Sequence, residues 1–369
     1  MLTETSPRGA PPAVTDIRRA RALLGVLLCA GLSGCGTSYV MQAASGQWHV
    51  SHERVPIDKV IEDPATGEEL RQRLILVREA RAFATDELQL PDNTSYRSYA
   101  DIHRPYVVWN VVATPEFSVV PKHWCFPVAG CVAYRGYFHE ASARKFALQL
   151  REQGYDVAVE GVPAYSTLGK FADPVLSSMM RYGDDELAAT IFHELAHQKL
   201  YVKDDSAFNE AFATTVEEVG LERWLIHSGA AARIAALRTE EARERELMQV
   251  LAQARARLST LYASQAPAAQ LRTGKADILA SLAAQIRELE RRDGLSYPLY
   301  DDWIRTGLNN AHLASVATYY DCVPGFRRLL EKEGNDLPRF YAAAATLGQL
   351  PKSERHARLC GAGAAAQSE

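Results

Sequence analysis

The sequence lacks several features that would place it in a large class of proteins. Acidic and basic residues nearly balance, with 45 Asp and Glu against 41 Lys and Arg, so no excess of positive charge indicates a nucleic-acid partner. One short apolar run and a mean hydropathy of -0.19 exclude a protein with several membrane-spanning helices. There is no internal repeat and no Cys-x-x-Cys pair, and the second absence argues against a zinc site built from thiolates.

The N-terminus has the features of an export signal. Arginines at positions 18, 19 and 21 precede an apolar stretch (22–32), which is too short to span a bilayer as a stable helix. The stretch closes with Leu-Ser-Gly-Cys at Cys35, which resembles the bacterial lipobox, where the cysteine is lipidated and becomes the mature N-terminus. The alternatives are a plain secretory signal and a buried apolar helix.

The resemblance to a lipobox implies a location and an anchor. Residues 1–34 would be a signal peptide with an upstream extension, and Cys35 would hold the protein to the bilayer. Gly36 follows the cysteine in place of Asp, and by resemblance to lipoprotein sorting rules this implies the periplasmic side of an outer membrane.

The remaining cysteines then lie in an oxidising compartment. One of the six leaves with the signal and Cys35 carries lipid, so four remain and allow three pairings. Proximity favours one disulfide between Cys125 and Cys131, around a small loop, and another between Cys322 and Cys360 near the C-terminus.

The pattern of apolar residues predicts an α+β protein. Residues 35–65 are polar and poorly periodic, so we expect a tether there, followed by a catalytic region over 66–228. Within it, helical spacing predicts a helix over 66–90, and β-branched and aromatic runs between 106 and 139, including Phe117–Val120, predict a small sheet. A helix over 140–153 and a strand over Tyr155–Val159 follow.

From residue 184 onward the chain is predicted to be almost entirely helical. Residues 229–292 carry two apolar stripes with a break at 264–267, which predicts an antiparallel helical hairpin with solvated, charged outer faces. Residues 293–358 form a C-terminal helical part, and 359–369 are expected to be a disordered tail.

A helix predicted to begin at Asp184 carries the pattern His193-Glu194-Leu195-Ala196-His197. Histidines four apart lie on the same face of a helix, one turn apart, and can bind one metal ion together. Glu194 lies roughly 100° round the helix, beside the ion, where it can act as general base toward water that the ion activates. Zinc lowers the pKa of such water to about 7.

A third ligand is found after a turn and helix cap at 204–206. The stretch Asn209-Glu210 begins a second helix, which we expect Gly220 to close, and two antiparallel helices would present Glu210 to both imidazoles. Two histidines and one glutamate leave the fourth tetrahedral position open, as in catalytic zinc sites.

Alternatives to this ligand set stay open. In one alternative, Glu217 or Glu218 is the true ligand, and Glu210 is an acidic residue at the start of the helix that the helix dipole stabilises. In another, the two histidines are core residues bonded to backbone carbonyls. Glu217 and Asn209 are also candidates to accept a hydrogen bond from a ligand histidine.

The stretches HELAH and NEAFA together resemble the gluzincin metallopeptidases of the thermolysin and aminopeptidase N type, although the spacer is shorter here. More closely, the chain resembles the bacterial putative aminopeptidase lipoproteins, in LSGC, GVPAYSTLGKFADP, HELAHQKLYVKDDSAFNEAFAT and NNAHLASVATYYDCVPGF. The resemblance implies a zincin-like fold, with a small N-terminal sheet over the active-site helix. It also implies Zn²⁺ held by His193, His197 and Glu210, with Glu194 as general base.

A peptidase also needs a hydrogen-bond donor for the oxyanion and an edge strand beside the substrate. His312, Tyr319 and Tyr320 share one helical face, and of the two tyrosines we prefer Tyr319 as donor; the alternative is a core-facing aromatic pair. Gly161–Leu168, about 25 residues before His193, is the expected substrate strand, and an ordinary interior strand is the alternative.

These observations predict a zinc-dependent peptidase of the periplasm that acts on peptide substrates. The name aminopeptidase rests on the family resemblance, because the G-x-M-E-N box of aminopeptidase N is absent, and an endopeptidase stays open. One alternative is a lipid-anchored envelope protein that acts by binding or as a scaffold, with a structural or vestigial metal site. The long charged hairpin supports this alternative. Another is a hydrolase of a different amide, such as a cell-wall crosslink.

Overall fold

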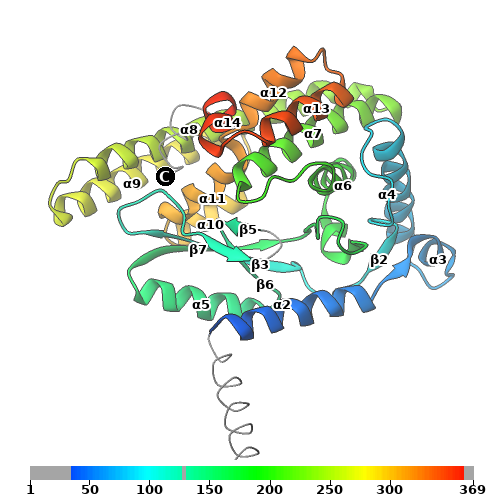
Figure 1. Ribbon diagram of the computed structural model, residues 1–369, viewed down its shortest axis with the longest axis horizontal. Helices are drawn as coiled ribbons and strands as arrows, with labels where there is room; N and C mark the ends of the chain where they lie inside the picture. The colour runs from blue at the N-terminus through cyan, green and yellow to red at the C-terminus, as the bar shows by residue number, and fades with distance from the viewer. Residues whose placement is uncertain (1–34, 127–129, 361–369) are drawn as a thin grey trace, which may run out of the picture. The chain divides into compact units, whose positions relative to one another are not determined.

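The computed structural model describes residues 35–126 and 130–360 (Figure 1). The chain divides into two compact units, Met1–Trp48 and His49–Glu369. The predicted signal peptide (1–34) and all but the first two residues of the predicted tail lie outside the described residues. No described helix is both long and apolar enough to cross a membrane.

Residues 35–65, predicted as a tether, hold regular structure instead. Helix α2 (Cys35–His52) begins at the predicted lipidation site and is followed by β1 (Val55–Pro56) and α3 (Ile57–Glu62). Val50 and Ile57 are buried in the main core of the second unit, so isolated apolar residues in a polar stretch are enough to order it.

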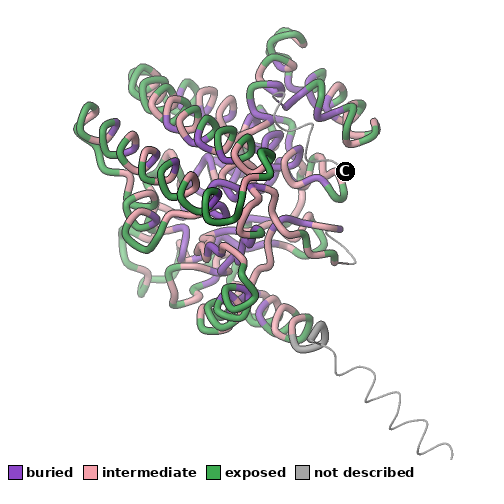
Figure 2. The backbone as a smooth tube through the Cα atoms, turned by 90° about the vertical axis from the view of Figure 1, so that its left-hand side faces the viewer, coloured by how far each residue is buried: buried purple, intermediate pink, exposed green. Residues whose placement is uncertain are grey.

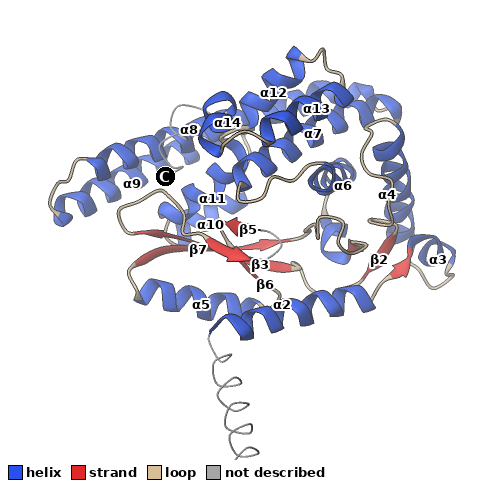
Figure 3. Ribbon diagram, in the orientation of Figure 1, coloured by secondary structure: helices blue, strands red, loops and turns tan. Residues whose placement is uncertain are grey.

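The central sheet has the order β6-β3-β7, with both pairings antiparallel (Figure 3). Its strands are β3 (Val108–Pro115), β6 (Arg135–Tyr137) and β7 (Tyr155–Val162). Strand β3 is almost wholly buried in the middle of the sheet, as its run of β-branched residues predicts, while β7 lies at an edge. Helix α5 (Glu140–Glu152) packs on one side of this sheet and α11 (Asn310–Tyr320) packs on the other.

Two smaller sheets complete the β structure. In one, β2 (Ser98–Ala100) lies between β1 and β8 (Val175–Leu176). In the other, β4 (Trp124–Phe126) pairs with β5 (Gly130–Val132), and Cys125 is opposite Cys131. The two cysteines are joined in a disulfide.

The strand predicted at Phe117–Val120 is wrong, because this run is a turn and bend after β3. Its apolar character has another cause: Val119 is buried in the core of the helical hairpin, beside Leu247 and Leu251. A short apolar run cannot by itself distinguish a strand from a loop that inserts side chains into a helical core.

The helices of the catalytic region and the C-terminal part surround the largest core. Helix α4 (Glu68–Asp86) packs against α6 (Asp184–Lys199), and α6 packs against α7 (Ser206–His227). The remaining helices here are the 3-10 helices η1 (Ser177–Arg181) and η2 (Ala231–Arg233), with α10 (Pro298–Thr306), α12 (Val323–Lys332), α13 (Leu337–Gly348) and α14 (Lys352–Leu359). A second disulfide, Cys322–Cys360, ties the start of α12 to the end of α14.

The hairpin consists of α8 (Ile234–Ala263) and α9 (Ala268–Asp293), which have their own core of apolar residues. Figure 2 shows buried and exposed residues along the same helices, as expected for amphipathic helices with solvated outer faces. Lys275 of α9 donates to Asp156 of β7 at 2.6 Å, and Tyr262 of α8 donates to Asn310 of α11 at 2.9 Å. The hairpin is therefore held to β7 and α11 by side chains near its tip.

Candidate active site

Two packed helices carry the predicted metal ligands. Helix α6 has three acidic residues in its first turn, where the helix dipole favours negative charge, and buries its apolar side against α4 and α7. Helix α7 begins at the cap residue Asp205, whose side chain accepts a hydrogen bond from Phe208 N at 3.2 Å. The turn between the helices is held by Asn209, whose amide group exchanges two hydrogen bonds with the backbone of Val202.

The sequence predicted that Gly220 closes this second helix. This prediction is wrong, because α7 continues to His227. The glycine has a packing role instead. A Cβ atom at Gly220 would lie 2.8 Å from Leu88 Cδ1 and 2.9 Å from Phe192 Cδ2. A residue without a side chain therefore lets α7 approach α6 closely, and this approach brings Glu210 to the histidines.

The structure brings His193, His197 and Glu210 together. Glu210 Oε2 lies 3.4 Å from His193 Nε2 and 3.4 Å from His197 Nε2, and all three ligand atoms lie within 4.8 Å of one another. Two atoms about 2.1 Å from a shared tetrahedral ion would lie roughly 3.4 Å apart. The spacing and the chemistry of the three donors therefore fit a divalent ion such as Zn²⁺.

The groups around the three donors favour a positive charge at this place. Burial alone would lower the pKa of His193, but the carboxylates of Glu210 and Glu217 raise it well above its ordinary value. His193 Nδ1 lies 2.8 Å from Glu217 Oε2, which fixes the ring so that Nε2 faces Glu210. His197 Nδ1 is buried and has no hydrogen-bond partner among the described residues.

These contacts distinguish the acids that the sequence left as alternatives. Glu210 is the acid that faces both imidazoles, Glu217 lies on the far side of His193, and Glu218 binds Arg327 Nε at 2.8 Å. Asn209 holds the turn and is bonded to the backbone of Val202, not to a histidine.

Glu194 lies between the two histidines in the sequence and is 8% exposed. Burial is the main cause that raises the pKa of its carboxyl group, and the nearby imidazoles lower it. Tyr96, which the sequence did not single out, is also buried beside it: burial raises the pKa of Tyr96 first, and Glu194 raises it further. No periodic pattern marks Tyr96, since it lies in a loop, with a φ of 60°.

The predicted oxyanion donors lie in different surroundings. His312 is buried in the first turn of α11, where its Nδ1 accepts from Asn309 N at 3.1 Å and its ring lies 4.8 Å from the Trp303 ring. Burial lowers the pKa of His312 to about 4, so it is neutral. No described contact joins His312 to the metal ligands. Tyr319 belongs to α11, but its side chain lies outside the described part of the structure.

Tyr320, the other tyrosine of the pair, donates its hydroxyl to Glu244 Oε1 at 2.7 Å. Burial raises its pKa well above the usual range, and Glu244, Tyr300 and Glu217 raise it further. Tyr320 therefore keeps its proton at neutral pH and lies near Glu217, the partner of His193.

The predicted substrate strand, Gly161–Leu168, is mostly a loop. Only Gly161 and Val162 belong to β7, and the chain after Val162 leaves the sheet in a stretch that contains Pro163. Strand β7 is nevertheless at the edge of its sheet and has one strand neighbour, β3, among the described residues.

Glu160 of β7 is a functional candidate that the sequence reasoning missed. Its Oε1 accepts the hydroxyl of Ser315 at 2.9 Å, and burial raises its pKa to about 7. No described cation forms an ion pair with it. Helix α11, which carries Ser315, packs against both β7 and the ligand-bearing α7. The sequence could not identify Glu160 as a candidate, because its partner Ser315 is 155 residues away and only the folded structure brings the two together.

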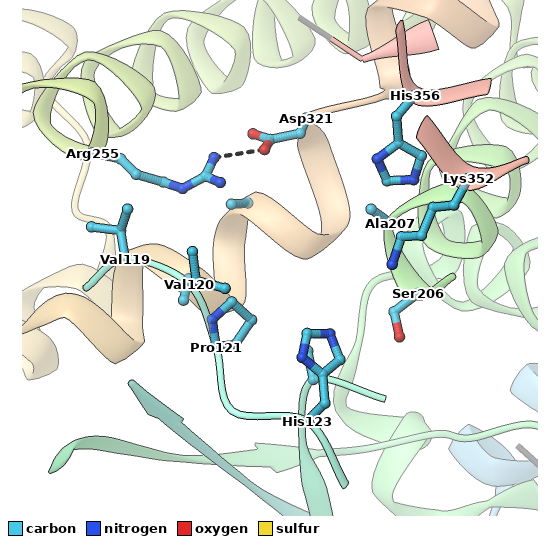
Figure 4. Close-up of a pocket in the computed structure, with 13 residues that line it drawn as sticks. Val119, Val120, Pro121, His123, Ser206, Ala207, Arg255, Asp321, Lys352 and His356 are labelled. Carbon is cyan, nitrogen blue, oxygen red and sulfur yellow. Dashed lines mark hydrogen bonds and ion pairs between the residues drawn. The ribbon is translucent and has the colours of Figure 1, made fainter. Parts of the chain in front are cut away.

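A cavity of about 70 Å³ lies at the start of α7, and its charged side chains already have partners (Figure 4). Arg255 pairs with Asp321 at 2.6 Å, and the His356 ring is 2.8 Å from the cap residue Asp205. Lys352 Nζ donates to Asp204 O at 3.1 Å. The contacts of His356 and Lys352 secure the start of α7, one turn before Glu210.

One further group of possible metal donors lies beside this cavity. The side chains of Cys322, His356 and Cys360 have donor atoms within 4.8 Å of one another. Because the two sulfur atoms form a disulfide and His356 Nε2 is bonded to Asp205, this group serves as a structural tie.

Comparisons with known proteins give one match. Neither the curated proteins nor the solved structures contain a significant match to the chain. A family model described as "Putative aminopeptidase" matches residues 38–359. This range includes both helices of the site, strand β7 and α11. Because the match covers most of the chain, the protein belongs to the family described as "Putative aminopeptidase".

Proposed function

We propose that the protein is a zinc-dependent aminopeptidase, with His193, His197 and Glu210 as the metal ligands. The observation that carries the proposal is the equal spacing of 3.4 Å from the Glu210 carboxylate to both imidazole Nε2 atoms. Membership of the aminopeptidase family supports the peptidase class. The bound ion would supply Lewis-acid chemistry, because it polarises a carbonyl and makes water acidic enough to ionise near neutral pH.

The side chains around the ligands have separate tasks in this proposal. Glu194 is on the same helix as both histidines but points round from them, so it can take a proton from the attacking water and give it to the leaving amine. Glu217 holds His193 in the orientation that directs Nε2 to the ligand position. Tyr96, whose buried hydroxyl lies near Glu194 and has no hydrogen-bond partner among the described residues, is the described donor best suited to the developing oxyanion.

Glu160 supports an aminopeptidase over an endopeptidase. Glu160 is half-buried and has one hydroxyl partner and no ion pair among the described residues, so its ionised form is costly unless a cation reaches it. The protonated α-amino group of a peptide is such a cation, and Glu160 is on an edge strand, one helix away from the metal ligands. We assign Glu160 to binding the free amino group.

We also propose that the protein acts in the periplasm, held to the outer membrane by lipid on Cys35. The Leu-Ser-Gly-Cys box supports the anchor. The disulfides Cys125–Cys131 and Cys322–Cys360 support an oxidising compartment, since disulfides rarely persist in the cytosol.

Metal content and turnover of the purified full chain test the proposal together. We expect about one zinc per parent chain, none in Glu210→Ala, and full zinc in the control Glu222→Gln, whose residue pairs with Arg238 away from the site. Glu194→Gln is expected to keep zinc and the fold but to lose turnover of aminoacyl-coumarin amides. A parent without bound metal, or a fully active Glu194→Gln, would refute the proposal.

The amino-group assignment needs its own comparison. The parent is expected to cleave leucyl-coumarin amide and to leave its N-acetylated form intact, while Glu160→Gln loses this preference. Equal cleavage of the free and acetylated forms by the parent would identify an endopeptidase-like site and contradict the role given to Glu160.

A further inference from the structure

A pocket of about 240 Å³ opens beside the first half of α8 and the segment that leads into α10. The proposed chemistry does not use it. Leu295 is 43% exposed on its wall, so apolar surface of the pocket is accessible from solvent. The apolar and aromatic walls are Leu247, Met248, Leu295, Tyr297 and Tyr300, and Glu244 is among the charged residues at the pocket.

Helix α11 connects this pocket to the proposed binding site for the amino group. Ser315 holds Glu160, and Tyr320, five residues further along the same helix, donates to Glu244 of the pocket at 2.7 Å. Five residues correspond to about 7.5 Å along a helix axis. Glu160 and the pocket residue Glu244 are therefore both bonded to α11, at positions about one and a half turns apart.

Tyr300 gives a second connection. Its phenol lines the pocket, and its pKa is raised first by burial, then by the carboxylates of Glu244 and Glu160. The two acids come from α8 and from β7, so Tyr300 lies between the pocket wall and the edge strand. This agrees with the connection through α11.

We infer that the pocket binds the side chain of the first substrate residue and selects large apolar or aromatic side chains. The inference rests on the proposed aminopeptidase function. An amino group held at Glu160 fixes the Cα atom of the first residue, and the side chain leaves that atom toward the nearest open space. A cavity of about 150 Å³ with apolar walls accepts benzene, so the larger pocket has room for a phenyl ring.

The test is a selectivity profile of the full-length enzyme on coumarin amides of Phe, Leu, Ala and Lys, measured as kcat/KM. The parent is expected to prefer Phe and Leu over Ala by roughly tenfold or more, the range that side-chain contacts in apolar pockets give. A preference for Lys over Phe would overturn the inference, since it would mean that the acids at the pocket, not its apolar walls, select the substrate.

Variants locate the preference in this pocket. Met248→Trp fills the pocket and is expected to lower the Phe-to-Ala ratio of kcat/KM roughly tenfold. Leu295→Asp is expected to lower the same ratio, and Leu299→Asp serves as its matched control. Leu299 is 50% exposed, four residues away, and does not line the pocket. Because Leu295 is exposed, its variant should fold even if Met248→Trp does not.

The outcomes separate this inference from the proposed function. If the parent cleaves no aminoacyl amide, the aminopeptidase proposal fails and the pocket loses its assignment with it. If the parent is active but Leu295→Asp and Leu299→Asp keep the parent ratio, only the pocket inference fails. A ratio lowered by Leu295→Asp alone supports it.

Discussion

Replacing Glu160 by Gln is expected to stabilise the protein at alkaline pH although it removes the proposed anchor for the substrate. In the folded protein burial raises the pKa of Glu160 to about 7, against an ordinary value of 4.5. The folded state therefore holds this proton at pH values where the unfolded chain has lost it. The stability that the proton contributes is complete below about pH 4.5 and is lost as the pH rises through 7.

The size of the effect follows from the two pKa values. Their difference corresponds to roughly 3 kcal/mol of destabilisation of the parent above pH 7. Gln has no charge to bury and can still accept the hydroxyl of Ser315. Glu160→Gln should thus unfold with a free energy up to about 3 kcal/mol larger than that of the parent near pH 8, and with an equal one near pH 4.5.

Urea unfolding with the disulfides intact and with a chelator in excess measures this difference without a contribution from metal binding. Glu152→Gln is the control, because Glu152 is exposed at the end of α5. A Glu160→Gln variant that is less stable than the parent near pH 8 would refute the burial argument. So would a difference that does not change with pH.

Two further predictions concern the residues that support the proposed metal ligands. Glu217→Gln should lower zinc affinity by roughly 10- to 100-fold, because Glu217 orients the His193 ring; competition with a chelator measures this, with Glu222→Gln as control. Asp205→Ala should cost about 3–5 kcal/mol in urea unfolding, because it removes the cap of α7 and leaves the buried Arg355 without its charged partner.

Each of these predictions has a result that contradicts it. Unchanged zinc affinity in Glu217→Gln would mean that the His193 ring is oriented by packing alone. For Asp205→Ala, a loss below about 1 kcal/mol would mean that the network around the cap contributes little. The carboxyl pKa of Asp205 is lowered, since His356 and Arg355 outweigh the effect of burial. Its contribution should therefore fade only as the pH falls through that lowered pKa.

The parts of the fold that the sequence predicted are those fixed by local patterns. Helices over 66–90 and 140–153 and the α8–α9 hairpin have continuous apolar stripes, so their periodicity determines them. The closeness of the two histidines could be predicted for the same reason, because both lie on one helix, four residues apart. Glu210 could be predicted because its helix follows after a short turn, which leaves few ways to pack.

The features that the sequence did not predict depend on long-range packing. The surroundings of Glu160 come from α11, and Val119 is apolar because it fills a gap in the helical hairpin. Gly220 has the signature of a helix end, but its function is the close approach of two helices, which only the partner Phe192 reveals. Val50 and Ile57 are buried in the core and Val60 and Ile61 pack against it, so long-range packing gives regular structure to a segment that looks like a tether.

The charges of the site give a physical reason for the exopeptidase activity that we propose. Glu210 and Glu217 face His193, and Glu194 lies nearby. The negative charge of these three carboxylates favours a divalent cation between His193, His197 and Glu210. That ion would satisfy these carboxylates but not Glu160, whose hydrogen-bond partner among the described residues is the hydroxyl of Ser315. Above its raised pKa, Glu160 therefore needs a second positive charge for complete pairing, and the described residues do not provide it. A substrate with a free amino group carries that charge into the site, whereas an internal peptide segment does not.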